Sequence, residues 1–172
     1  MSEKPSYLGL LNAISVAETD AGCYLEEWAK VTPSDDVRAV IRTVALRESE
    51  HGLAFEKRID ELGYAVEPRS DPKHAERMAI ASSTALSDKE KFEALGLGRR
   101  PQNGTSDVFD KFFENKDLDP VTGGLLGRYV AEERDSGRKF AECYGLLCAA
   151  ADKAAAKSNG AKSKGKSKGK KK

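Results

Sequence analysis

Three residues have the types and the spacing of metal ligands: Glu18, Glu48 and His51. Glu48 and His51 are three positions apart, so on a helix both side chains lie on one face and can reach a single cation. Glu18 and Glu48 lie at similar distances on either side of the break at 32–34, which brings them to one level of an antiparallel helix pair. Carboxylates combined with an imidazole suit iron, manganese or zinc. The pattern predicts a metal site.

Both ligand-bearing segments carry an apolar stripe with spacings of three and four, and the candidate ligands interrupt it near its midpoint. The two stripes are Tyr7, Leu11, Ile14, Glu18, Ala21, Leu25 and Trp28, then Val37, Ile41, Val44, Glu48, His51, Phe55, Ile59 and Leu62. An unpaired buried carboxylate costs several kcal/mol or takes up a proton, so these positions need partners. A metal ion is one such partner. A hydrogen-bonded Glu–His pair in the core is the alternative.

Long helical segments must position these residues. Helical periodicity extends over 6–30, 34–62, 72–95 and 119–156, with a short helical piece at 107–115. Ser34 is a candidate N-cap and Gly63 a candidate C′ residue. No segment alternates with period two over a useful length, so no sheet is expected. The expected fold is all-α, an antiparallel up-down four-helix bundle formed by residues 1–156.

The ligand pattern resembles that of the ferritin-like superfamily, closest to its rubrerythrin-type members. In that family helices 1 and 3 each supply a glutamate, helices 2 and 4 each supply Glu-x-x-His, and the bundle binds two iron or manganese ions. The resemblance covers roughly residues 6–150. It implies that Glu18, Glu48 and His51 are ligands. When the last helix is aligned on the second, Glu133 takes the position of Glu48, and Ser136 takes that of His51.

The second half of the chain departs from the family pattern. Ser82 and Ser136 mark the positions where the helix-3 glutamate and the helix-4 histidine are missing. The two missing residues would bind one of the family's two ions. The other ion takes the helix-1 glutamate, the helix-2 histidine and both bridging glutamates. The resemblance therefore implies one ion per chain, iron or manganese, held by Glu18, Glu48, His51 and Glu133. The implied role is metal handling or oxidative stress, and any catalysis would be that of a ferritin-like oxidoreductase.

Alternatives remain for several of these residues. Glu133 could be a solvated glutamate of the charged run AEERD, in which Glu132 looks more exposed. Tyr24 and Tyr129 either hydrogen-bond near the site or pack in the core. His74 is expected at the surface. A metal-free member of the fold, acting as a structural or interaction module, is the second hypothesis for the whole chain.

Residues 157–172 differ from the rest, with eight lysines and no acidic residue. The formal net charge of +1 thus divides into +8 on this tail and −7 on residues 1–156. A segment of Lys, Gly and Ser cannot bury apolar surface and is predicted to be disordered. It could bind a polyanion such as DNA nonspecifically, or only aid solubility. A nucleic-acid-associated protein that uses this tail is the third hypothesis.

The remaining features bear on compartment and partners. Three cysteines without a CxxC pair indicate reduced thiols in a cytoplasmic protein. Neither a signal peptide nor an apolar run long enough for a membrane span is found, so no membrane partner is expected. The GxG at 96–98 follows no strand, which argues against a phosphate loop. A homodimer is compatible with these features and stays open.

Overall fold

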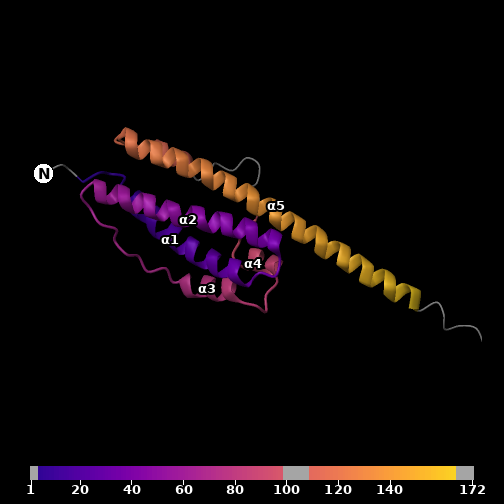
Figure 1. Ribbon diagram of the computed structural model, residues 1–172. Helices are drawn as coiled ribbons and strands as arrows, with labels where there is room; N and C mark the ends of the chain where they lie inside the picture. Colours follow the sequence, from indigo (N-terminus) through magenta and orange to yellow (C-terminus); the bar gives the residue numbers. More distant parts are fainter. Residues whose placement is uncertain (1–3, 99–108, 166–172) are drawn as a thin grey trace, which may run out of the picture.

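The structure is a computed structural model that describes residues 4–98 and 109–165 (Figure 1). In these residues the chain is all-α, as predicted, with five α-helices, one 3-10 helix and no strand. The helices are α1 (Leu8–Val31), α2 (Asp35–Glu61), α3 (His74–Ser82), α4 (Asp88–Ala94), the 3-10 helix η1 (Asp110–Phe113) and α5 (Pro120–Gly165).

Helices α1 and α2 form a tightly packed antiparallel hairpin. The Ser34 hydroxyl accepts a hydrogen bond from the Val37 amide at the start of α2, and Gly63 follows α2 with φ of 83°, so both predicted helix ends are confirmed. Two glycines set the close approach of the helices. A Cβ added to Gly22 would lie 2.3 Å from Ser49 Oγ, and one added to Gly52 would lie 2.4 Å from Thr19 Oγ1.

The predicted single helix over 72–95 is wrong, because the chain breaks between α3 and α4. The Ser83 hydroxyl accepts hydrogen bonds from the Ala85 and Leu86 amides, which replaces the helical pattern there. Ser87 then starts α4 with a capping box that includes Glu90. The break also directs Asp88 into the core.

The buried Asp88 carboxylate holds α4 against the end of α1. It accepts hydrogen bonds from Trp28 Nε1 and Thr32 Oγ1, each at 2.7 Å. The Trp28 ring also meets Phe92 edge-on, with ring centroids 4.8 Å apart. Both oxygens of this buried carboxylate are therefore satisfied by the chain itself.

Helix α5 runs antiparallel to α2 and parallel to α1. Just before α5, Asp119 bonds to Tyr7 near the start of α1 and to Arg58 near the end of α2. Further along α5, Asp135 pairs with Arg47, 2.6 Å away in the middle of α2. A strict up-down order would make the last helix antiparallel to α1, so that part of the predicted fold is wrong. Helix α4 lies against the end of α1, whereas α5 begins beside the start of α1, and this reverses the expected direction.

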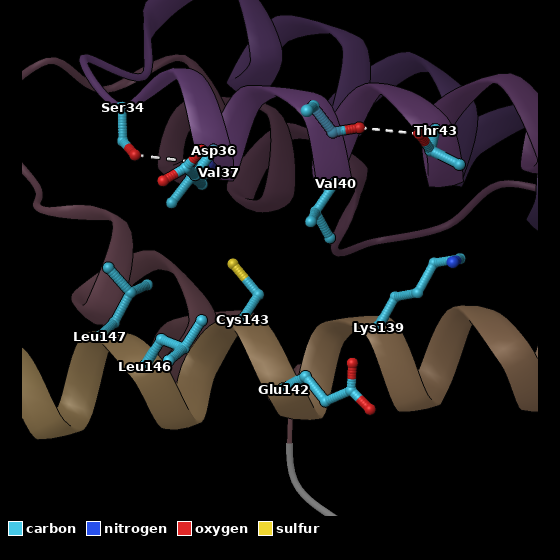
Figure 2. Close-up of a pocket in the computed structure, with 11 residues that line it drawn as sticks. Ser34, Asp36, Val37, Val40, Thr43, Lys139, Glu142, Cys143, Leu146 and Leu147 are labelled. Atoms are coloured by element: carbon cyan, nitrogen blue, oxygen red, sulfur yellow. Dashed lines mark hydrogen bonds between the residues drawn. The ribbon is translucent and has the colours of Figure 1, made fainter.

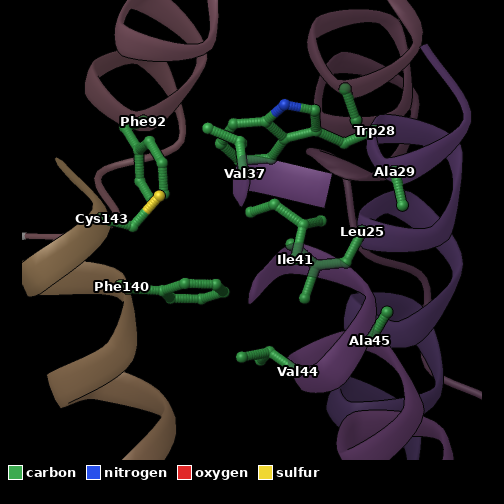
Figure 3. Close-up of a cluster of buried hydrophobic side chains, with 11 residues drawn as sticks. Leu25, Trp28, Ala29, Val37, Ile41, Val44, Ala45, Phe92, Phe140 and Cys143 are labelled. Atoms are coloured by element: carbon green, nitrogen blue, oxygen red, sulfur yellow. The ribbon is translucent and has the colours of Figure 1, made fainter. Parts of the chain in front are cut away.

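Two apolar clusters lie on either side of the middle of the α1–α2 hairpin. The cluster toward the turn between α1 and α2 contains Leu25, Trp28, Ala29, Val37, Ile41, Val44, Ala45, Ala81, Phe92, Phe140 and Cys143 (Figure 3). The cluster toward the other end contains Tyr7, Leu8, Leu11, Ile14, Phe55, Ile59, Leu126, Tyr129 and Val130. The candidate ligands lie between the two clusters.

Helix α5 continues well past the other helices (Figure 1). Leu146 is 74% exposed, and all residues from Ala149 to Lys157 are exposed. The helix extends to Gly165, beyond the domain boundary predicted at residue 156. Residues 157–165 of the tail belong to this helix, so disorder stays a prediction only for residues 166–172, which lie outside the described part. Within the described residues, none of the helices has both the length and the apolar character that a membrane span requires.

Candidate metal centre

The structure brings together the four residues predicted as ligands. Glu18 comes from α1, Glu48 and His51 from α2, and Glu133 from α5. One potential ligand atom from each lies within 4.8 Å of the other three. The first three residues are buried and Glu133 is half-buried. Among the residues with described side chains, no second group of three or more such ligands occurs.

Local sequence explains why these side chains meet. The i, i+3 spacing puts Glu48 and His51 on one face of α2. Gly22 and Gly52, one turn beyond Glu18 and Glu48, remove the side chains that would otherwise hold α1 and α2 apart. Because α5 runs antiparallel to α2 from the contact between Asp119 and Arg58, Glu133 and Glu48 lie at similar distances from that contact and therefore at the same level.

Three buried polar atoms of the cluster have no hydrogen-bond partner in the described structure: Glu18 Oε2, His51 Nδ1 and Glu133 Oε1. His51 Nδ1 lies 3.6 Å from each of the other two atoms. Buried polar atoms are nearly always paired, so each exception needs a cause. Three unpaired atoms that face one another indicate room for a shared partner.

The other polar atoms around this space are held by hydrogen bonds. The Tyr129 hydroxyl donates to Glu18 Oε1 at 2.9 Å. On the far side of the imidazole, His51 Nε2 and Glu132 Oε2 form a hydrogen bond of 2.7 Å. An ionised carboxylate only accepts, so Nε2 carries the hydrogen and Nδ1 is the atom that faces the cluster. Arg128 Nε donates to the second Glu132 oxygen at 3.0 Å.

Sequence reasoning missed the part played by Glu132. It treated this residue as the more exposed neighbour of Glu133, whereas the side chain is half-buried against His51. The signal available in the sequence was the spacing of Arg128 and Glu132, an i, i+4 pair that orients the carboxylate along the helix. Tyr129 proved to hydrogen-bond at the site, one of the two alternatives considered for it.

The pKa values of the cluster reflect crowded negative charge. Burial, reinforced by Glu18 and Glu133, raises the pKa of Glu48 far above its usual range. Burial and the charge of Glu18 raise the pKa of Glu133 to about 7. Burial also acts to raise the pKa of Glu18, but its interactions with the nearby His51, Glu48 and Tyr129 outweigh burial and lower that pKa. The cluster thus holds more carboxylates than its single imidazole can neutralise.

The donor set fits a cation. Ligand atoms that bind one ion at about 2.0–2.2 Å lie within about 4.4 Å of one another. The 4.8 Å limit observed here needs shifts of only a few tenths of an ångström. The imidazole also has the usual arrangement of a metal ligand, with one nitrogen facing the site and the other hydrogen-bonded to a carboxylate.

Ser136, where the resemblance implied a missing second histidine, has partners within the chain. Ser136, at the place expected for a second histidine, is buried, and its hydroxyl accepts a hydrogen bond from Arg47 Nη1 at 3.4 Å. The same guanidinium pairs with Asp135. The serine at this position therefore contacts a positively charged arginine.

Two other predicted positions lie away from the cluster. Ser82 is exposed, and its hydroxyl donates to the Met78 carbonyl at 2.8 Å, so it does not mark an empty ligand position as expected. The reason is that α3 is short and lies against α1 rather than forming a full third helix of a bundle. His74 is exposed and paired with Asp20, which agrees with its prediction as a surface residue.

No protein-family model, curated protein or solved structure matches this chain. The function therefore rests on the geometry and chemistry of the site. Polyanion contact through residues 157–172 and a homodimer stay predictions.

A separate groove lies between the first half of α2 and α5 (Figure 2). Its volume is about 470 Å³, and Val40, Cys143, Leu146 and Leu147 give it a largely apolar wall. Cys143 is a free thiol, as are Cys23 and Cys148. This groove does not contain any of the four candidate ligands.

Proposed function

We propose that this chain is a ferritin-like metal-binding protein that holds one iron or manganese ion between α1, α2 and α5. The observation that carries the proposal is the convergence of four potential ligand atoms, three of them buried without a partner. An acidic cluster alone would not suffice. Buried atoms that face a common point, among carboxylates whose ionisation is opposed by burial and by one another, favour a cation.

The course of the chain supports the ferritin-like part of the proposal. An antiparallel α1–α2 hairpin is followed by a long connection and then by α5 parallel to α1. Ferritin-like bundles contain one long crossover connection of this kind. The short α3 and α4 replace a full-length helix, so this chain would be a reduced variant of that fold.

Ligand chemistry supports iron or manganese. Three carboxylates and one imidazole form an oxygen-rich donor set, which suits these ions better than softer metals. Arg47, hydrogen-bonded to Ser136, supports one ion rather than two. When bound, iron or manganese supplies Lewis acidity and one-electron chemistry. The protein residues position it, with Glu132 and Tyr129 orienting His51 and Glu18. The role we propose is metal handling or protection against oxidative stress.

Metal content per chain tests the proposal. Protein purified without chelator, and metal-free protein reconstituted with Fe²⁺ or Mn²⁺, should contain one ion per chain after gel filtration. Glu48→Ala and His51→Ala should each lose it. The matched control is Glu50→Ala, because Glu50 lies on α2 between them but is exposed.

Two results would contradict the proposal: wild-type protein that retains no metal, or unchanged metal content in the Glu48→Ala and His51→Ala variants. The metal-free alternative makes its own prediction. Replacing Glu48 and His51 together by Leu and Phe should then leave stability unchanged or improve it, with no effect of chelator on the melting temperature of the wild type.

A further inference from the structure

A cavity of about 510 Å³ adjoins the carboxylates of the candidate metal centre. Glu18, Glu48 and Glu133 form one part of its lining, and His51 does not contribute. The cavity therefore reaches the cluster from the side opposite the imidazole. Cavities of this size are typical of small-molecule sites, which usually combine an apolar wall with a few polar groups.

The cavity exists because small residues line it where α1 and α5 face each other. Ala17 and Ala21 contribute from α1, and Gly137 contributes from α5. A Cβ added at Gly137 would meet no atom within 4 Å, which shows that the space beside it is open. The turn Gly96–Gly98, in which both glycines have positive φ, lies against the same space where a full bundle would have a helix.

The remaining wall is mostly apolar and partly aromatic. Leu25, Leu97, Phe140 and the half-buried ring of Tyr24 line it. Burial raises the pKa of Tyr24 to about 12, so its hydroxyl stays protonated and can donate or accept a hydrogen bond. A flat apolar body would contact these side chains while a polar group faced the carboxylates.

The charge of the lining selects against an anion. Arg77 is a cationic side chain of the cavity, but its guanidinium is already paired with Asp20 at 2.9 Å and with Asp71. Asp71 also lines the cavity, together with the three glutamates. With a divalent ion bound, the four carboxylates of the described lining still outweigh the charges of the ion and of Arg77, so a neutral ligand suits this part of the site better than a carboxylate or phosphate.

We propose that this cavity binds a small neutral organic molecule with an aromatic or flat apolar body, whose hydroxyl group reaches the metal ion. The inference rests on the proposed function, because the ion provides the anchor for that hydroxyl. It goes further by naming a ligand class and the residues that select it. Tyr24 and Phe140 would contact the body of the ligand.

Catechol tests this inference, since it is neutral at pH 7, and benzoate serves as an anion of similar size. Protein loaded with Fe²⁺ in the absence of oxygen and freed of unbound iron should bind catechol saturably by calorimetry. Benzoate should compete at least tenfold less well. Metal-free protein should bind catechol at least tenfold more weakly by calorimetry.

The Ala21→Phe variant tests the cavity independently of the metal site. The ring should fill the cavity and weaken catechol binding at least tenfold, while one iron per chain remains. Ala149→Phe, on the exposed end of α5, is the matched control and should bind catechol like the wild type.

The outcomes distinguish the two proposals. Protein that takes up neither iron nor manganese overturns both. Iron-loaded protein overturns only the cavity inference if it does not bind catechol, releases its iron to catechol, binds benzoate equally well, or binds catechol unchanged after Ala21→Phe.

Discussion

Two polar junctions connect the same three helical regions, and their electrostatics are opposite. At the junction where α1 begins and α2 ends, Asp119 accepts hydrogen bonds from Tyr7 and Thr122, both at 2.6 Å, and from Arg58 at 3.0 Å. Burial alone would raise the pKa of Asp119, but these bonds hold it well below its usual range. Near the middle of α1 and α2, burial instead raises the pKa values of Glu48 and Glu133.

The difference lies in the supply of positive charge. Arg58 is part of the chain, so the Asp119 junction is complete and stabilises the fold by itself. The central cluster has three carboxylates, one imidazole and three unpaired buried atoms. Where a buried carboxylate only has to hold helices together, an arginine of the chain can compensate its negative charge. The central cluster lacks one, and that contrast favours a ligand cation over a purely structural role.

Removing the complete junction should have the largest effect. Asp119→Ala eliminates the carboxylate that caps the Val121 and Thr122 amides, and it leaves Arg58 and Tyr7 without their acceptor. A lost cap costs about 1 kcal/mol and the lost hydrogen bonds about 1 kcal/mol each. We expect a loss of about 3 kcal/mol in urea unfolding.

The control for this prediction is Asp60→Ala, an exposed aspartate near the same end of α2. It should change stability by less than about 0.5 kcal/mol. Equal stability of Asp119→Ala and the wild type would show that the junction contributes little to holding α5 in place.

A smaller effect is expected from Glu132, which belongs to the incomplete junction but is not a ligand. Glu132→Leu removes the acceptor that orients His51, and substitutions of such partners typically lower metal affinity 10–100-fold. Glu132→Gln keeps a neutral acceptor and should lie between this variant and the wild type. Competition with a chromophoric chelator measures the affinity.

The stoichiometry of the Glu132 variants should stay at one ion per chain. The same Leu substitution at the exposed Glu50 should leave affinity unchanged. If Glu132→Leu bound metal as tightly as the wild type, the hydrogen bond to His51 would have no role in positioning the imidazole.

The smallest effect is a difference in pH dependence. The folded-state pKa values of Glu48 and Glu133 are raised, so their stabilising contribution is fully present only at acid pH. It is lost as pH rises above about 4, through about 7 for Glu133 and further into alkaline pH for Glu48. The pKa of Asp119 is lowered, so its contribution is present at neutral pH and is lost as pH falls below about 4. Metal-free wild type should therefore lose roughly 1 kcal/mol between pH 5 and pH 8.

Glu48→Gln should flatten this loss, because it removes one of the crowded charges. Urea unfolding at several pH values, with chelator present, measures both proteins. A wild type whose stability rises from pH 5 to pH 8 would contradict the charge balance described for the cluster.

The hairpin and the meeting of three of the four candidate ligands could be predicted because they depend on local pattern. In a helical hairpin with a short turn, residues at equal distances along the chain from the turn lie opposite each other. Glu18 and Glu48 are at similar distances from Ser34, so they were expected to meet. Glu133 required only that α5 be aligned on α2. These inferences need periodicity and turn chemistry alone.

The segment from Gly63 to Asp119 could not be predicted in the same way. The break after Ser82 is favoured by a local hydrogen bond to the Ser83 hydroxyl. It is also favoured by the hydrogen bonds that Trp28 and Thr32, distant in sequence, donate to Asp88. The direction of α5 depends on where the connection returns, which a helical pattern does not contain. Glu132 was missed for a similar reason, since its partner lies on another helix.

The distribution of ligands over three helices has a consequence for the mechanics of the molecule. An ion bound by His51 and Glu133 would be a cross-link between α2 and α5, and it would close a loop of about 80 residues. By analogy with a disulfide, constraining such a loop is worth on the order of 4 kcal/mol in the unfolded chain. Glu18 and Glu48 belong to a hairpin that already packs closely, so loss of the ion would loosen α5 first. How firmly the projecting end of α5 is held would then depend on whether the metal site is filled.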